Sequence, residues 1–148
     1  MKEEAMEKFK KFLKTRGLKF TRERKIILDQ VFSVHDHFDV EDLLYMFRKR
    51  KKQVSRASIY RTLSLLVESG LVGKVDFGEG RAYYEHVFGH VHHDHLVCKE
   101  CGQVVQFEDQ VIEKRQQDIC KEHGFRLDYH TLNIFGICPE CQKNGENN

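Results

Sequence analysis

The chain has 148 residues, of which 40% are apolar and 32% are charged, with a single proline. This size and composition are typical of one folded domain or two small ones, and they exclude a disordered chain. No apolar run approaches the roughly 18–20 residues of a membrane span, and the charged, amphipathic start is unlike a signal peptide. We therefore expect a cytoplasmic protein with no membrane partner.

The net charge of +2, taken alone, argues against nucleic acid as a partner, but it is unevenly distributed. Residues 1–85 contain 19 Lys and Arg against 13 Asp and Glu, a net of +6, whereas residues 86–148 contain 6 against 10, a net of −4. Seven of the nine histidines and all five cysteines lie in the second segment. The sequence therefore predicts two domains, a basic one over 1–85 and an acidic, ligand-rich one over 86–148.

Four amphipathic helices are predicted in the basic domain. Apolar residues recur at helical spacing over residues 6–13, 26–32, 40–47 and 56–69. Thr21, Asp39 and Ser55 precede the last three of these segments as N-cap residues. Two strands, 71–76 and 81–85, then flank a glycine-bearing turn at 78–80 and predict a β-hairpin. Short helices closed by a hairpin are typical of a winged helix-turn-helix domain.

The fourth helix has an unusual polar face in its first two turns. It lacks carboxylates there and presents Ser55, Arg56, Ser58, Tyr60, Arg61 and Thr62. A recognition helix enters the major groove by its N-terminal end, where carboxylates would be repelled by phosphate, so the pattern predicts DNA binding. Lys74 and Arg81 of the hairpin suit the DNA backbone or minor groove. The alternative is an ordinary amphipathic core helix.

The acidic domain mixes strands with one helix. Strands are predicted at 93–98, 103–107 and 127–137, and a helix at 109–123. One helix on a small antiparallel sheet leaves a face and an edge open, which predicts that a second copy covers them in a homodimer. The expected fold class is α+β, with an N-terminal winged helix-turn-helix domain and a small C-terminal α/β dimerisation domain.

Two Cys-x-x-Cys pairs predict a structural zinc site. Each pair can bind one ion with two thiolates from a tight turn, and Gly102 lets the backbone fold back behind the metal. Four sulfurs make a closed tetrahedral site of the structural kind, formed by Cys98, Cys101, Cys138 and Cys141. Disulfides, idle thiols or an iron–sulfur cluster are the alternatives. Cys120 is expected to be a small core residue, with a redox role as the alternative.

Four consecutive ligand-type residues, His-His-Asp-His at 92–95, fall on a predicted strand. Alternate side chains of a strand point to opposite faces, so His93 and His95 share one face and His92 and Asp94 the other. The pattern predicts two metal sites flanking the strand. Ligands available to complete them are His37, Glu85, Glu113 and His130. The remaining candidates, expected to be solvated loop residues, are His35, His86 and His90.

Three blocks of sequence, VSRASIYRTL at 54–63, HHDHLVCKECG at 92–102 and the pair Cys138/Cys141, resemble the ferric uptake regulator (Fur) family of bacterial metal-dependent repressors. The resemblance extends from about Leu18 to Cys141. It implies a homodimer with N-terminal winged-helix DNA-binding domains and C-terminal dimerisation domains.

The resemblance also assigns site residues by position. The family's regulatory metal site matches His37, Glu85, His93 and His95. Its additional site in the dimerisation domain matches His92, Asp94, Glu113 and His130. The four paired cysteines match its structural zinc site. The positions where the family contacts DNA match Lys19, Tyr60 and Arg61.

Two departures from the family pattern bear on the signal that is sensed. The segment from Glu85 to His93 is one residue longer than in familiar iron-sensing members, which leaves His86 as an alternative to Glu85. Peroxide-sensing relatives use two aspartates, whose equivalents here are Glu85 and Gln106. Because Gln106 carries no negative charge, the pattern favours an iron sensor. Peroxide sensing and zinc sensing stay open as alternatives.

We therefore predict a metal-dependent transcriptional repressor that binds double-stranded operator DNA as a homodimer, senses Fe²⁺ and controls iron-uptake genes. Zinc is expected at the cysteines, and Fe²⁺ or Mn²⁺ at the regulatory site, where Zn²⁺ can substitute in vitro. A regulatory ion bridging the two domains would set two recognition helices about one DNA turn apart, roughly 34–36 Å. One alternative is a metal-dependent hydrolase, but the basic helix disfavours it, so we expect that the protein is not an enzyme. The other alternative is a zinc-stabilised DNA-binding protein without a sensing role.

Overall fold

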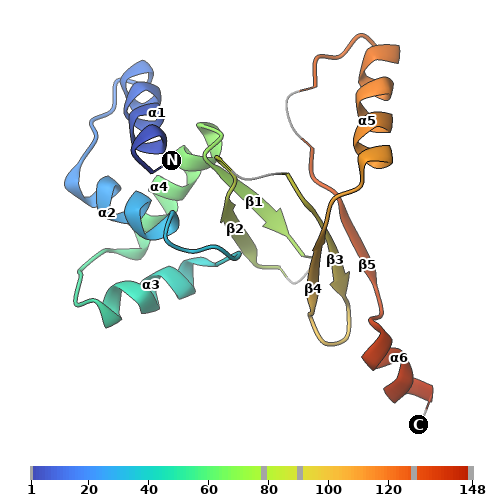
Figure 1. Ribbon diagram of the computed structural model, residues 1–148. Coiled ribbons are helices and arrows are strands. Elements are labelled where there is room, and N and C mark those ends of the chain that lie inside the picture. The colour runs from blue at the N-terminus through green and yellow to red at the C-terminus, as the bar shows by residue number, and fades with distance from the viewer. Residues whose placement is uncertain (1, 78–79, 90–91, 128–129, 147–148) are drawn as a thin grey trace. The chain divides into compact units, whose positions relative to one another are not determined.

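The computed structural model describes residues 2–77, 80–89, 92–127 and 130–146, and it divides the chain into two compact units, Met1–Val91 and His92–Asn148 (Figure 1). The division lies after the predicted boundary at residue 85 because the hairpin continues beyond that point. His86 is still paired in a strand, and the Val87 N–H donates to the Leu71 carbonyl over 3.1 Å. Among the described residues no helix has both the length and the apolar character that a membrane crossing requires.

Four helices build the first unit: α1 (Lys2–Thr15), α2 (Arg22–Val31), α3 (Val40–Lys49) and α4 (Arg56–Glu68). The three predicted N-caps are confirmed, since the side chains of Thr21, Asp39 and Ser55 each accept a hydrogen bond from a backbone N–H in the first turn. Asp39 and Asp42 form a reciprocal capping box, which fixes where α3 begins.

Helix α4 forms the centre of this unit, because it packs against α2, α3 and the first strand of the hairpin. Its Ile59, Leu63 and Leu66 side chains are fully buried and belong to one apolar core with side chains of α1, α2 and α3. The largest of the buried side chains are Phe9, Phe38, Phe47, Leu13, Ile27, Leu28, Leu43, Ile59, Leu63 and Leu66. Burial of this stripe positions the opposite face of α4 toward solvent.

The hairpin consists of β1 (Val72–Asp76) and β2 (Ala82–His86), paired antiparallel with Lys74 opposite Tyr84. Two residues of its predicted turn, 78 and 79, lie outside the described residues, and Gly80 adopts a left-handed φ of 72°. Phe38 forms an isolated antiparallel bridge with Tyr84 on the outer edge of β2. The four helices followed by this hairpin confirm the predicted winged helix-turn-helix fold.

The second unit contains β3 (Asp94–Cys98), β4 (Val104–Phe107), α5 (Gln110–Glu122), β5 (Asn133–Gly136) and α6 (Pro139–Glu146). The sheet order is β4-β3-β5, and β3 pairs with β5 in parallel. The expectation of an antiparallel sheet is therefore wrong for this edge. After β4, the crossover through α5 returns the chain to the far side of β3 in the same direction, as parallel pairing requires. The last helix, α6, was not predicted.

Candidate metal centres and nucleic-acid interface

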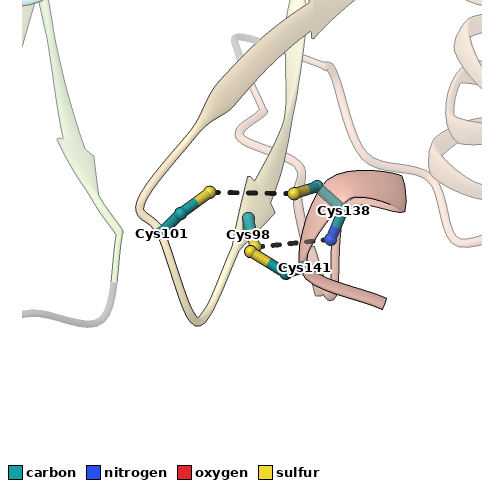
Figure 2. A group of neighbouring side chains, drawn as sticks. All are labelled: Cys98, Cys101, Cys138 and Cys141. Atoms are coloured by element: carbon teal, nitrogen blue, oxygen red, sulfur yellow. Dashed lines mark hydrogen bonds between the residues drawn. The ribbon is translucent and has the colours of Figure 1, made fainter. Parts of the chain in front are cut away.

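The four paired cysteines converge on one point of the second unit (Figure 2). Cys98 ends β3 and Cys101 lies in the turn toward β4, where Gly102 has a φ of 75° and its N–H donates to the Cys98 carbonyl. Cys138 directly precedes α6, and Cys141 lies in its first turn. The four sulfurs lie within 4.8 Å of one another, and the Cys101 and Cys138 sulfurs are 3.7 Å apart.

The electrostatics of this cluster fit a divalent cation. Backbone N–H groups of Cys101 and Cys138 point at the Cys98 sulfur and lower its pKa to about 6. In contrast, the neighbouring Cys138 and burial raise the pKa of the Cys141 thiol far above its ordinary value. Without a cation the cluster therefore holds a thiolate much more easily at Cys98 than at Cys141. A bound Zn²⁺ would stabilise all four thiolates together.

A second cluster gathers His92, Asp94, Glu113 and His130 from three segments of the same unit. The Nε2 atoms of His92 and His130 are 2.8 Å apart, and Asp94 Oδ1 lies 3.0 Å and 3.4 Å from them. Glu113, from the first turn of α5, brings Oε1 to 3.3 Å from His130 Nε2. Two imidazoles and two carboxylates in this arrangement are a ligand set for Fe²⁺, Mn²⁺ or Zn²⁺.

Asp94 shows that the protein itself does not complete this cluster. Its side chain is fully buried, and Oδ2 has no hydrogen-bond partner among the described residues. A buried carboxylate is costly unless it is paired or binds a metal ion. The residues present therefore fit a cation at this point.

The other face of β3 carries two of the four residues matched to the regulatory site. The His93 and His95 rings lie 5.1 Å apart, edge to face, as strand alternation predicts. Asn133, directly opposite His95 on β5, places Oδ1 3.3 Å from His95 Nδ1 and so orients the ring. Sequence reasoning missed Asn133, because the parallel pairing that puts it beside His95 leaves no local signal.

The remaining two residues of that set, His37 and Glu85, belong to the first unit. The His37 ring packs against the rings of Phe77 and Tyr83, with centroid distances of 5.1 Å and 5.7 Å, and its Nδ1 is 2.9 Å from Asp36 Oδ1. Glu85 is half-buried in β2. Each unit therefore carries two residues of the regulatory set, and their common ligation of one ion stays a prediction.

The predicted DNA-reading face of α4 is exposed at most of its positions. Arg56 and Arg61 lie in solvent and the Tyr60 side chain is 48% exposed, whereas Arg56 also pairs with Glu41 of α3. Ser55 and Ser58 bond to each other as part of the cap. Lys19, before α2, is exposed as well.

Thr62 does not belong to this face. It is only 3% exposed, so the prediction that it contacts DNA is wrong. Thr62 is one of the buried residues of α4, with Ile59, Leu63 and Leu66, and α4 packs against α2 and α3.

Two further expectations need correction. His86 is a buried strand residue rather than a solvated one, with its ring stacked on Phe32 at 5.0 Å and Nδ1 3.2 Å from the Val31 carbonyl oxygen. Cys120 is half-buried, because α5 has no fully buried residue. His35 is exposed, with its ring centroid 5.6 Å from that of His86, and His90 lies outside the described residues.

The model of the ferric uptake regulator family matches residues 15–135. This chain belongs to that family. It is 40% identical over 139 residues to the ferric uptake regulation protein of Campylobacter jejuni, covering 92% of this chain and 87% of that one. It is 38% identical over 145 residues to the corresponding protein of Neisseria meningitidis, covering 95% and 99%.

Solved structures agree with this assignment. The ferric uptake regulator of Helicobacter pylori, described as having three functional metal binding sites, superposes with a TM-score of 0.78 at 28% identity, covering 96% of this chain and 94% of that one. The manganese-containing regulator of Pseudomonas aeruginosa gives 0.75 at 34% identity, covering 86% and 95%. Family members are transcription regulators rather than enzymes, and DNA-binding, metal-binding repressors are the type of protein predicted here.

Proposed function

We propose that this chain is an Fe²⁺-responsive transcriptional repressor that binds operator DNA as a homodimer and controls iron-uptake genes. The observation that carries the proposal is the presence, in one chain, of a helix with an exposed basic face and of clustered imidazoles and carboxylates. This cluster surrounds the buried Asp94, whose Oδ2 has no hydrogen-bond partner among the described residues. The first feature suits phosphate and base edges, and the second suits a divalent cation.

The cysteine cluster would hold structural Zn²⁺, because four thiolates leave no open position for chemistry. The regulatory ion would be held by His37 and Glu85 from the first unit and by His93 and His95 from the second. Such an ion favours one arrangement of the two units and so shifts the population toward the DNA-competent form. His92, Asp94, Glu113 and His130 would hold the additional ion.

An apolar row on the sheet of the second unit supports the homodimer. Leu96 lies directly opposite Val105 on β4 and Ile134 on β5, so the three side chains share one face. All three are exposed, at 42%, 46% and 44%. A contiguous apolar row on a small sheet is stabilised when a second copy covers it.

Iron is favoured over peroxide as the signal by the residue opposite His95 on β4. That residue is Gln106, which is exposed and carries no charge. In a peroxide sensor, a second carboxylate at this position would strengthen binding of the regulatory iron that reacts with peroxide. This chain has the uncharged Gln106 there instead. Zinc sensing is the competing function, because imidazole and carboxylate ligands bind Zn²⁺ strongly.

The test is DNA binding by the full chain with its cysteine-bound zinc retained. A duplex is first selected from a random pool in the presence of Fe²⁺ without oxygen, and its affinity is then measured by fluorescence anisotropy with Fe²⁺, Mn²⁺, Zn²⁺ or no added metal. We expect Fe²⁺ and Mn²⁺ to raise the affinity at least ten-fold. Equal affinity with and without added metal would reject the sensing role, and a response to Zn²⁺ alone would establish the zinc sensor.

The double variant His37→Ala, Glu85→Ala is expected to lose the metal response while it keeps metal-free binding. A matched control, His123→Ala with Glu108→Ala, removes the same side-chain types from exposed positions and should respond as the wild type does. A full metal response in the first variant would reject the bridging site. Loss of DNA binding after peroxide, with oxidised His37 or His93 found by mass spectrometry, would instead identify a peroxide sensor.

A further inference from the structure

An uninterrupted run of five basic residues, Arg48–Lys52, links α3 to α4, and we call it the basic turn. All five side chains are exposed. Within the part of the chain that the structure describes, none of them pairs with a carboxylate. Other cations of the same unit do so, as Arg16 does with Glu68 and Arg81 with Asp39. Five neighbouring unpaired charges repel one another, so the turn is suited to a polyanion.

Stabilisation of α3 explains only part of this run. Cations in the last turn of a helix interact favourably with its dipole, and Arg48 and Lys49 occupy that turn. Lys51 and Lys52 lie beyond the C-cap Arg50, and Lys51 adopts a left-handed φ of 53° that is uncommon for its residue type. Helix geometry therefore gives no reason for lysine at these two positions.

A hollow of about 650 Å³ lies between the basic turn and the start of α4. Arg48 and Lys52 line it together with Arg56, and Glu23 is the one carboxylate among its lining residues. Arg56 and the neighbouring Ser55 are also members of the predicted DNA-contact set. The basic turn thus continues the surface that α4 presents, adding the charges of Arg48 and Lys52 to that of Arg56 around one concavity.

We propose that the basic turn binds phosphate groups of the DNA backbone beside the segment read by α4. The proposal rests on the proposed function, since it extends the same DNA interface. Lysine and arginine on phosphate give affinity without sequence information, because every base pair presents the same backbone. The turn therefore sets the strength and the salt dependence of binding rather than the choice of operator.

The test variant is Lys51→Asn with Lys52→Gln, measured in the full chain with the selected duplex and with an unrelated duplex. Asparagine tolerates the left-handed backbone at position 51, and glutamine keeps the backbone N–H that Lys52 donates to the Phe47 carbonyl. We expect the slope of log affinity against log salt to fall by about 0.9 for each phosphate that the variant no longer neutralises. Affinity should drop roughly ten-fold on both duplexes alike.

The matched control is Lys114→Gln with Lys121→Gln, which removes the same charge from exposed positions on α5. Its salt slope should equal that of the wild type. Circular dichroism and Mn²⁺ binding without DNA should be unchanged in both variants. An unchanged salt slope in the turn variant, or an equal loss in the control, would overturn the proposal. Failure of the wild type to bind any duplex with Fe²⁺, Mn²⁺ or Zn²⁺ would instead reject the proposed function itself.

Discussion

Phe38 and Tyr84 exchange two backbone hydrogen bonds, with the Phe38 N–H donating to the Tyr84 carbonyl over 2.9 Å and the Tyr84 N–H to the Phe38 carbonyl over 2.7 Å. Their rings also stack, with centroids 6.2 Å apart. Phe38 follows His37 and Tyr84 precedes Glu85, so this pair fixes the two proposed ligand segments of the first unit against each other. The same contact attaches the loop before α3 to the hairpin.

We expect Phe38→Ala to lower the free energy of unfolding by about 3–5 kcal/mol, because its ring is 1% exposed and its removal leaves a cavity in the core. Urea denaturation followed by circular dichroism measures the change. Phe125→Ala, at a position that is 73% exposed, should alter it by less than about 0.5 kcal/mol. Similar losses in both variants would contradict the assigned core.

Arg61 and Thr62 are neighbours in sequence, but they should differ completely in DNA binding. Arg61 is exposed on α4, so Arg61→Ala should cost about 1–3 kcal/mol of DNA affinity and leave stability nearly unchanged. Thr62 is buried, so Thr62→Val should keep DNA affinity at the wild-type value. Fluorescence anisotropy with the selected duplex measures both affinities. A loss of DNA affinity for Thr62→Val comparable to that for Arg61→Ala would show that the DNA-contacting face of α4 is assigned incorrectly.

Asp94→Asn should remove stabilisation by metal without harming the metal-free protein. The substitution eliminates a buried carboxylate whose Oδ2 has no partner among the described residues, so metal-free stability should stay the same or rise. Affinity for Mn²⁺ at this cluster should fall by roughly 10–100-fold or more. Calorimetry of the zinc-retaining protein measures this, with the exposed Glu108→Gln as the control. Unaltered Mn²⁺ stoichiometry and affinity would exclude Asp94 as a ligand.

The cysteine cluster should titrate unevenly once its metal is removed under reducing conditions. The pKa of Cys98 is lowered to about 6, so its thiolate absorbance should appear as the pH rises through that value and vanish below it. The raised pKa of Cys141 keeps that thiol protonated across the neutral range. Ultraviolet titration should show a step near pH 6 that is absent in Cys98→Ser and in denatured protein. Persistence of the step in denaturant would show that the fold is not its cause.

Leu96→Glu should separate the dimer into monomers. A charge at the centre of the row formed with Val105 and Ile134 would have to be buried in the proposed interface without a partner. Light scattering coupled to size-exclusion chromatography measures the mass, and DNA affinity should fall with it. Tyr45→Glu, at an exposed position on α3, should leave the mass unchanged. If the Leu96→Glu protein keeps the wild-type mass, the dimer interface must lie on another surface.

Local features of this protein follow from its sequence alone. Asp39, Thr21 and Ser55 cap helices because a short polar side chain reaches a backbone N–H within the same turn. The division of residues 92–95 between two faces follows from the alternation of a strand, and each cysteine pair needs only its own tight turn. These interactions join residues close in sequence, so spacing and residue type determine them.

Tertiary packing decided the rest. Parallel pairing of β5 with β3 brings Asn133 to His95, and the bridge between Phe38 and Tyr84 joins segments far apart in the chain. Thr62 is buried in the helix that packs against α2 and α3, and the His86 ring is covered by the ring of Phe32. Such contacts arise because apolar surface is buried between distant segments, and that burial leaves no periodic trace in the sequence near the residues it affects.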